Sequence, residues 1–347
     1  MHQLKDIIEN KIISNLTKSF SRSPLKLNEL HETDAEIIQL ENSPYDLAIT
    51  IDTICEEIKT GLYSDPYQIG WMSVMVNISD LAAVGASPIG IVISQILPQN
   101  ISDEFIEKLQ QGINDSCKKC GTFVLGGDTN FGDELIISGC AIGTIEKGKY
   151  LKRVGCKTGD KIYTSGNIGT GNAYAFQKLF SKNDSQFVYH PTAKLEWRNI
   201  LKKYSSSCID TSDGILSSLD QLMRLNNVGF KFRNDWDKAM DCSSEQLFGN
   251  NNLPIWLLLA GEHGEFELLF TIPAEKKLDF LKEASHLYLK PIYLGETTED
   301  PKISLNLYNK EQSLDTEKIR NLTFEKDFSP SKYLQKLLEI DTYFKNA

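Results

Sequence analysis

The sequence predicts an α/β protein with two domains of similar size, and three observations lead to this prediction. The chain has 347 residues, which is more than one domain usually needs. Apolar, strand-like runs alternate with segments of helical periodicity along most of the chain. The pattern restarts after a basic, glycine-bearing stretch at 146–160, so we expect one domain over residues 1–148 and a second over 149–347.

The first half reads as strands and helices in alternation. Residues 1–16 form an amphipathic pattern with charges throughout, which predicts a helix and not a signal peptide. Run 89–97 (IGIVISQIL) is rich in β-branched residues and predicts a buried strand. The expected order is a strand at 46–52, a helix at 66–85, a strand at 89–97, a helix at 103–119, and strands at 122–125 and 134–145.

The second half repeats the alternation with shorter strands. The expected order is a strand at 161–165, a helix at 172–180, a strand at 207–210, a helix at 214–225, a strand at 267–272 and a helix at 273–288. One more amphipathic helix is expected in the tail after Leu322.

Composition and charge exclude several classes of function. Acidic residues outnumber basic ones 47 to 37, a net charge of −10, which disfavours nucleic acid and anionic membranes as partners. No apolar run is long enough to span a bilayer. The seven cysteines are an odd number in a long chain and do not indicate a disulfide framework. We therefore expect a cytoplasmic protein.

Aspartates at the junctions of predicted elements are the informative feature. A single such residue is usually a helix cap or a turn residue. Six of them are harder to explain in that way, because carboxylates brought together repel one another unless a cation lies between them. Mg²⁺, which prefers oxygen ligands and bridges to phosphates, is the expected ion. The six are Asp34, Asp52, Asp80, Asp128, Asp210 and Asp213.

Two glycine-containing stretches, which we expect to be loops, and one histidine add weaker signals. The stretch 126–129 (GGDT) would let a ligand approach the backbone closely. Segment 165–171 (SGNIGTG) runs from a strand into a helix, whose N-terminus could meet a phosphate, although an ordinary tight turn explains it more simply. It fits neither the P-loop nor the dinucleotide fingerprint. His263 could be catalytic, but an exposed loop histidine is the commoner case.

Four motifs together resemble the thiamine-monophosphate kinase family. They are IGWMSVMVNISDLAAVGASPIGI, VLGGDTNFGDELIISGCAIG, RVGCKTGDKIYTSGNIGTG and IDTSDGI, in the family's order. The resemblance covers most of the chain from Asp34 to about Glu296. It implies the two-domain fold of the aminoimidazole ribonucleotide synthetase-like superfamily, with a dimerising N-terminal α/β domain and a C-terminal α/β domain. It also implies a homodimer, ATP as co-substrate, several Mg²⁺ ions and a small phosphorylated acceptor.

The resemblance implies a role for each matching residue. Metal ligands would be Asp34, Thr50, Asp52, Asp80, Asp128, Asp210 and Asp213. ATP contacts would be Gly127, Asp128, Arg153 and Ser212. The most direct part in phosphoryl transfer would fall to Asp80, Asp128 and Asp213. Such transfer needs positioning and charge neutralisation more than covalent help from the protein.

The acceptor half departs from the family pattern. Lys59 stands where the family has a substrate-contacting His, and Gly264 stands where it has a substrate-contacting Glu. These changes make the expected pocket more positive, which disfavours a thiazolium cation. Substrate contacts are then expected from Lys59, His263 and Glu265. Three hypotheses stay open: a thiamine-monophosphate kinase, a related ATP-dependent enzyme with another acceptor, and a nucleotide-binding protein without turnover.

Overall fold

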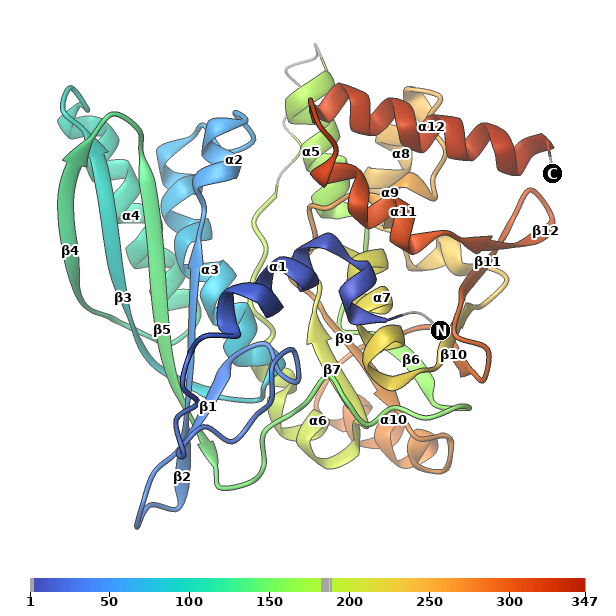
Figure 1. The fold of residues 1–347 in the computed structure, drawn as a ribbon, viewed down its shortest axis with the longest axis horizontal. Helices are drawn as coiled ribbons and strands as arrows, with labels where there is room; N and C mark the ends of the chain where they lie inside the picture. Colours follow the sequence, from blue (N-terminus) through green and yellow to red (C-terminus); the bar gives the residue numbers. More distant parts are fainter. Residues whose placement is uncertain (1–2, 182–186, 188, 347) are drawn as a thin grey trace. The chain divides into compact units, whose positions relative to one another are not determined.

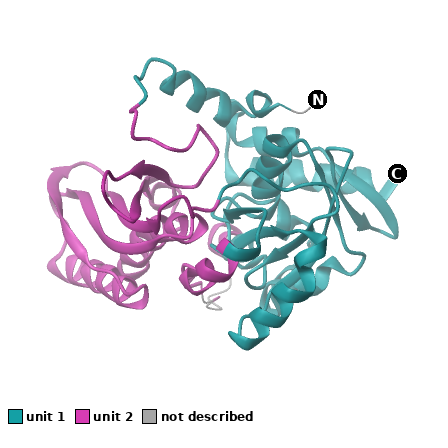
Figure 2. Cartoon of the chain, turned by 90° about the horizontal axis from the view of Figure 1, so that it is seen from below, with its two compact units in different colours: residues 1–22, 152–174, 203–347 teal, residues 23–151, 175–202 magenta. Residues whose placement is uncertain are grey.

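The computed structural model describes residues 3–181, 187 and 189–346, which fold into two units (Figure 2). Unit 1 comprises Met1–Arg22, Lys152–Tyr174 and Lys203–Ala347. Unit 2 comprises Ser23–Leu151 and Ala175–Lys202. The change of unit after Leu151 lies three residues from the boundary expected at 148. The N-terminal segment and residues 175–202, however, each belong to the unit on the other side of that boundary.

Unit 2 is built on a five-stranded sheet in the order β1-β2-β5-β3-β4 (Figure 1). Only β3 and β4 run parallel, and the other neighbouring pairs are antiparallel. The strands are β1 (Glu36–Gln39), β2 (Tyr45–Thr53), β3 (Ser87–Pro98), β4 (Val124–Gly132) and β5 (Ile136–Glu146). The helices are α2 (Cys55–Lys59), α3 (Pro66–Ala83) and α4 (Asp103–Lys119).

Helix α3 is the core of unit 2 and positions one of the predicted metal ligands. Asp65 caps its first turn by accepting from the Gln68 amide, and Pro66 occupies the position where a missing N–H costs nothing. Most of its side chains are buried against the sheet and α4. Asp80 lies in its last turn and is only half-buried.

Two glycines let α3 and α4 cross at close range. A Cβ on Gly70 would lie 2.0 Å from the Leu109 carbonyl oxygen, and one on Gly112 would lie 2.0 Å from the Tyr67 carbonyl oxygen. Any larger residue would push the two backbones apart.

Unit 1 is built on a seven-stranded sheet in the order β12-β11-β8-β10-β6-β9-β7. The strands are β6 (Lys161–Thr164), β7 (Ser207–Asp210), β8 (Gly229–Phe232), β9 (Leu268–Ile272), β10 (Ile292–Thr298), β11 (Ile303–Leu307) and β12 (Lys310–Leu314). The helices of this unit are α1 (Ile8–Thr17), α7 (Ile215–Asn226), α8 (Cys242–Asn250), α9 (Leu257–Ala260), α10 (Lys277–His286), α11 (Thr316–Asn321) and α12 (Pro330–Asn346). Helices α5 (Thr170–Phe180) and α6 (Arg198–Tyr204) carry the chain from one unit to the other.

A buried ion network fixes the N-terminal segment to unit 1. Asp220 on α7 is fully buried and binds both Arg224, at 2.8 Å, and Arg320 of α11, at 2.9 Å. Arg224 donates to the Gln3 carbonyl at 2.8 Å, and Arg320 reaches Glu9 of α1 at 3.3 Å. The network therefore ties α1 to the helix that follows the Asp210–Asp213 segment.

The expected elements are largely confirmed, with one correction. The strand expected at 122–125 is β4, which runs on to Gly132, so the GGDT stretch is part of a strand and not a loop. Parallel hydrogen bonding to β3 holds these residues extended. Several elements were not predicted, namely strands β1, β8, β10, β11 and β12 and helices α2, α6, α8, α9 and α11. None of the helices in the described residues combines the length and apolar character needed to cross a membrane.

Candidate functional site

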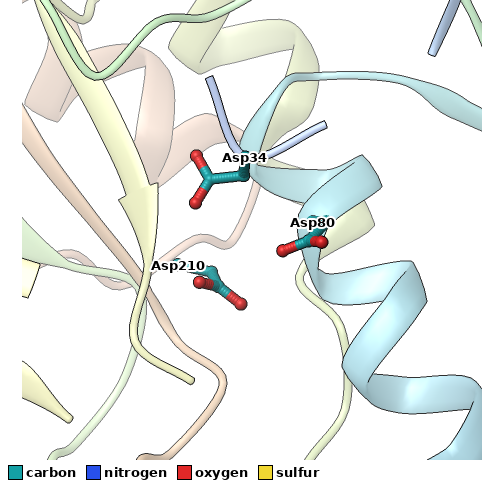
Figure 3. A group of neighbouring side chains, drawn as sticks. All are labelled: Asp34, Asp80 and Asp210. Carbon is teal, nitrogen blue, oxygen red and sulfur yellow. The ribbon is translucent and has the colours of Figure 1, made fainter. Parts of the chain in front are cut away.

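Two of the predicted metal ligands come together within unit 2. Asp34 lies in the loop before β1, where the Thr33 hydroxyl bonds the Ala35 carbonyl, and Asp80 lies on α3. Carboxylate oxygens of the two lie within 4.8 Å of each other. Figure 3 shows both side chains. Asp210, also labelled there, belongs to unit 1. Two oxygen donors at this separation fit one hard divalent cation.

The neighbours of Asp80 come from strand β2. The Thr50 hydroxyl donates to Asp80 Oδ2 at 2.5 Å, so this threonine orients the carboxylate. Asp52 lies two residues further along the strand, on the same face, and its backbone N–H bonds the buried Asn77 side chain at 3.0 Å. The predicted ligands Asp34, Thr50 and Asp80 thus lie close together near the contact between β2 and α3, and Asp52 lies further along the same face of β2.

Asp128 lies elsewhere in unit 2. In the sheet register Asp52 is aligned with Gly139, Ile93 and Gly127. The residues of this row lie on the face of the sheet that packs against α3. Asp128 belongs to the next row, with Ser94 and Ser138, and so points to the opposite face. Three strand spacings of about 4.8 Å put roughly 14 Å of sheet between β2 and β4. The carboxylate is exposed and accepts from the Asn130 amide at 2.7 Å.

Gly127 has a role in the packing of the sheet in addition to the predicted contact with ATP. A Cβ at this position would lie 1.9 Å from the Ile93 carbonyl oxygen, so the close pairing of β4 with β3 requires glycine. Lys59, at the end of α2, is exposed.

The predicted residues of unit 1 follow strand β7. Asp210 ends the strand and is buried, and the Ser212 hydroxyl donates to its Oδ1 at 3.0 Å. Asp213 precedes Gly214, whose φ of 82° turns the chain into α7. Arg153 lies nearby, and its carbonyl accepts from Asn226 near the end of α7. Burial raises the pKa of Glu9, the charge of Asp213 raises it further, and the charge of Arg153 lowers it, so both side chains lie near Glu9.

The glycine-rich segment 165–171 does not present a free helix N-terminus. The Gly169 amide at the start of α5 donates to the Glu265 carboxylate at 2.6 Å. A Cβ on Gly171 would lie 2.1 Å from the Gly264 carbonyl oxygen. The protein's own loop thus occupies the position where a phosphate was considered, and the tight-turn interpretation holds.

His263 and Glu265 are less accessible than the sequence suggested. Burial lowers the pKa of His263 to about 3, so its imidazole is neutral at physiological pH. Its ring lies 6.0 Å from that of Tyr174. Glu265 is 3% exposed, and burial raises its pKa to about 8. Both side chains are therefore uncharged near neutral pH.

Glu262 is an acidic residue at this site that the sequence analysis missed. Its side chain is exposed, and its Oε1 accepts from the Thr323 hydroxyl at 3.4 Å. Although its side chain is exposed, loss of solvation next to the surrounding protein raises the pKa of Glu262, and the negative charge of Asp213 raises it further. Gly264 cannot carry a side chain, because a Cβ there would lie 1.5 Å from the Thr211 carbonyl oxygen. The Gly-Glu pair at 261–262, two residues before the expected position, was the signal available in the sequence.

Comparisons with known proteins agree with the motifs. Residues 32–145 match the family model "AIR synthase related protein, N-terminal domain". The thiamine-monophosphate kinase of Haemophilus influenzae is 32% identical over 265 residues, which cover 74% of this chain and 79% of that protein. The enzyme of the same name from Nitrosopumilus maritimus is 29% identical over 306 residues, 86% of this chain and 94% of that protein.

A solved structure shares the fold. AaThiL complexed with AMPPCP and TMP superposes with a TM-score of 0.72 at 20% identity, covering 90% of this chain and 98% of that one. The fold is therefore the two-domain fold of the aminoimidazole ribonucleotide synthetase-like superfamily. At more than 30% identity over most of both chains, the relationship to the Haemophilus enzyme goes further than fold, and this chain belongs to the thiamine-monophosphate kinase family.

Proposed function

We propose that this protein is a Mg²⁺-dependent kinase that transfers the terminal phosphoryl group of ATP to thiamine monophosphate. The observation that carries the proposal is the 32% identity to the Haemophilus influenzae kinase. AaThiL, which shares the fold, was solved with an ATP analogue and TMP. Six aspartates that match the family motifs are present, although Thr33 stands where the first motif usually has another Asp; the six are Asp34, Asp52, Asp80, Asp128, Asp210 and Asp213.

The carboxylates of each unit would bind metal. In unit 2 the pair Asp34 and Asp80 would hold one ion, with Thr50 and Asp52 beside it. In unit 1, Asp210 and Asp213 would supply further ligands. Such ions, when bound, neutralise the charge of the phosphates and align them for transfer. In this proposal both sets are needed for turnover.

The other residues would position ATP and the acceptor. Arg153 and Ser212 would contact the nucleotide, with Arg153 spreading charge that develops on the transferred group. Because the acceptor is itself a phosphate, it is a competent nucleophile at neutral pH and needs no general base. His263 agrees with this, because burial lowers its pKa to about 3 and makes it a weak proton acceptor.

Two compounds are candidates for the molecule that accepts the phosphoryl group. Lys59 at the family's His position favours an acceptor with more negative charge than thiamine monophosphate. Glu262 returns a carboxyl group close to Asp213, but its pKa of about 8 leaves it mostly uncharged near neutral pH. The 32% identity to the Haemophilus influenzae kinase weighs in favour of the family's acceptor. We therefore keep thiamine monophosphate as the acceptor, and a more anionic phosphorylated metabolite as the second candidate.

A coupled ADP-release assay decides between the two acceptors. With thiamine monophosphate we expect kcat/KM of at least ~10⁴ M⁻¹s⁻¹, an ordinary value for an enzyme. If thiamine monophosphate gives no turnover and a more anionic acceptor gives ADP release, the more anionic compound is the acceptor. No ADP release with any phosphorylated acceptor, although ATP binds, would leave a nucleotide-binding protein.

We also propose that the protein is a homodimer in which Asp128 acts across the interface. Strand β4 is the outer strand of its sheet, and nearly all of its residues are exposed. Large apolar side chains lie along it and before it, at Phe123, Val124, Leu125 and Phe131. A second copy covering this outer strand would bury them. Asp128 points to the face of the sheet opposite α3 and away from Asp80, so a partner's site is the one it would serve.

Mixed dimers test this arrangement. Asp80→Asn and Asp128→Asn should each be inactive alone. If Asp128 serves the partner's site, one site of each mixed dimer is intact, and remixing the two variants restores roughly a quarter of wild-type activity. If Asp128 serves its own chain, both sites of the mixed dimer stay damaged and activity does not return.

We further propose a cytoplasmic location. All seven cysteines are free thiols, and burial raises the pKa of Cys117 to about 11 and of Cys120 and Cys156 to about 12. Thiols of this kind are unreactive and suit a reducing compartment.

A further inference from the structure

Three segments of unit 1 contact one another closely, and one of them contains the Asp210–Asp213 stretch. The Gly264 amide donates to the Ser212 carbonyl at 2.8 Å, and the Thr211 amide donates to the Glu267 carbonyl at 2.9 Å. Gly171 packs on the Gly264 carbonyl with no room for a Cβ. Stretches 165–171, 210–214 and 261–267 therefore hold one another by backbone contacts.

Glu265 lies at the centre of this arrangement. One carboxyl oxygen accepts from the Gly169 amide at 2.6 Å and so caps helix α5. The other oxygen is buried, and the Thr211 side chain lies near the carboxyl group. The next residue, Phe266, is held at a φ of 58°, a costly conformation for a side chain of this size. The surrounding structure must enforce this geometry.

We infer that Glu265 is a positioning residue, not a substrate contact: its bond to Gly169 locks segment 261–267 in the conformation that supports the Asp210–Asp213 stretch. The inference rests on the proposed function, since it assigns metal binding to these aspartates. A side chain 3% exposed cannot reach an acceptor. It can, however, set where Ser212 and its neighbours lie, because the same segment bonds the Ser212 carbonyl and the Thr211 amide.

Two variants of Glu265 separate the possible roles. Glu265→Gln keeps a hydrogen-bond acceptor at the same reach and resembles the protonated acid. Glu265→Asp keeps the carboxyl but is one methylene too short for the bond to Gly169. We expect Glu265→Gln to stay within about threefold of wild type. Glu265→Asp should lose at least about tenfold in kcat and need about ten times more Mg²⁺ for half-maximal rate, while the acceptor KM is unchanged.

Glu275→Gln, an exposed residue of the same unit, is the matched control and should behave as wild type. Thermal unfolding checks that each variant is folded; if Glu265→Asp is not, the Mg²⁺ dependence of Glu265→Gln must still match wild type. A raised acceptor KM in both Glu265 variants, with unchanged Mg²⁺ dependence, would overturn the inference in favour of a substrate contact. An inactive wild-type protein would instead count against the proposed function.

Discussion

At the scale of single residues, the Thr50–Asp80 bond is the clearest sign of a prepared site. A threonine hydroxyl directed at a carboxylate fixes its rotamer before any ligand arrives. Orientation of this kind is worth about 10–100-fold in metal affinity in other proteins. Asp34, which lies close by, then completes a pair of oxygen donors.

Asp80→Asn should lower ATP turnover by at least about 100-fold, because it removes one negative charge while keeping the shape of the side chain. Thr50→Val should lower it by about tenfold, because the carboxylate keeps its charge and loses its orientation. Both are measured by ADP release at saturating Mg²⁺. An Asp80→Asn enzyme of wild-type activity would refute the metal site.

Glu265 also makes stability depend on pH. Its pKa is raised from an unfolded value of 4.5 to about 8, so the native state holds the proton more tightly than the unfolded state. Stability from this group is full below pH 4.5 and decreases as pH rises towards 8, by at most about 1.4 kcal/mol per pH unit. In Glu265→Gln, chemical unfolding between pH 5 and 8 should show a smaller loss with pH. Parallel curves for the two proteins would contradict this.

At the scale of elements, the ends of helices were predicted correctly where a capping residue or a terminal charge lies within one turn of the end. Helix α4 begins after Ser102, whose hydroxyl caps Phe105, and it ends at a pair of lysines, as expected for residues 103–119. The GGDT stretch was misassigned because its residues favour turns, and the hydrogen bonds that extend it come from β3, some 35 residues away in sequence. Likewise, nothing local reveals that Glu265 caps α5.

The crossing of α3 and α4 gives a prediction at this scale. Gly70→Ala gains about 1 kcal/mol of helix propensity but places a methyl group against the Leu109 carbonyl. We expect a net destabilisation of about 2 kcal/mol, measured by chemical unfolding. Gly249→Ala is the matched control, because open space surrounds that helical position, and it should be neutral or stabilising. Equal effects of the two substitutions would contradict the close crossing.

At the scale of the whole molecule, the sequence predicted two α/β domains and the acids they carry, but not which segments make up each unit. Periodicity reports which face of an element is apolar and not which partner covers it. Residues 175–202 join unit 2 through bonds such as Trp71 Nε1 to the Pro191 carbonyl, at 2.9 Å. The N-terminal segment joins unit 1 through Arg224 and Arg320.

The proposed dimer is tested at this scale by sedimentation. The wild-type protein should sediment as a dimer at micromolar concentration. Phe131→Asp puts a charge on the exposed outer strand β4 and should give a monomer with little activity. Leu278→Asp, an equally exposed apolar position on α10, should leave the dimer intact. A fully active wild-type monomer would contradict the proposal.

The interleaving of the two units constrains the order in which the chain can fold during synthesis. The first 22 residues emerge from the ribosome first, yet their partners Gln221, Arg224 and Arg320 are made some 200 to 300 residues later. Unit 2 likewise lacks its last segment until residue 202 has been translated. Neither unit can therefore complete its core as an independent early step. The N-terminal segment, with Ile12, Leu16 and Phe20 exposed even in the native state, stays without its partners until they are made. Apolar surface that is left uncovered during synthesis favours aggregation, which chaperones counter.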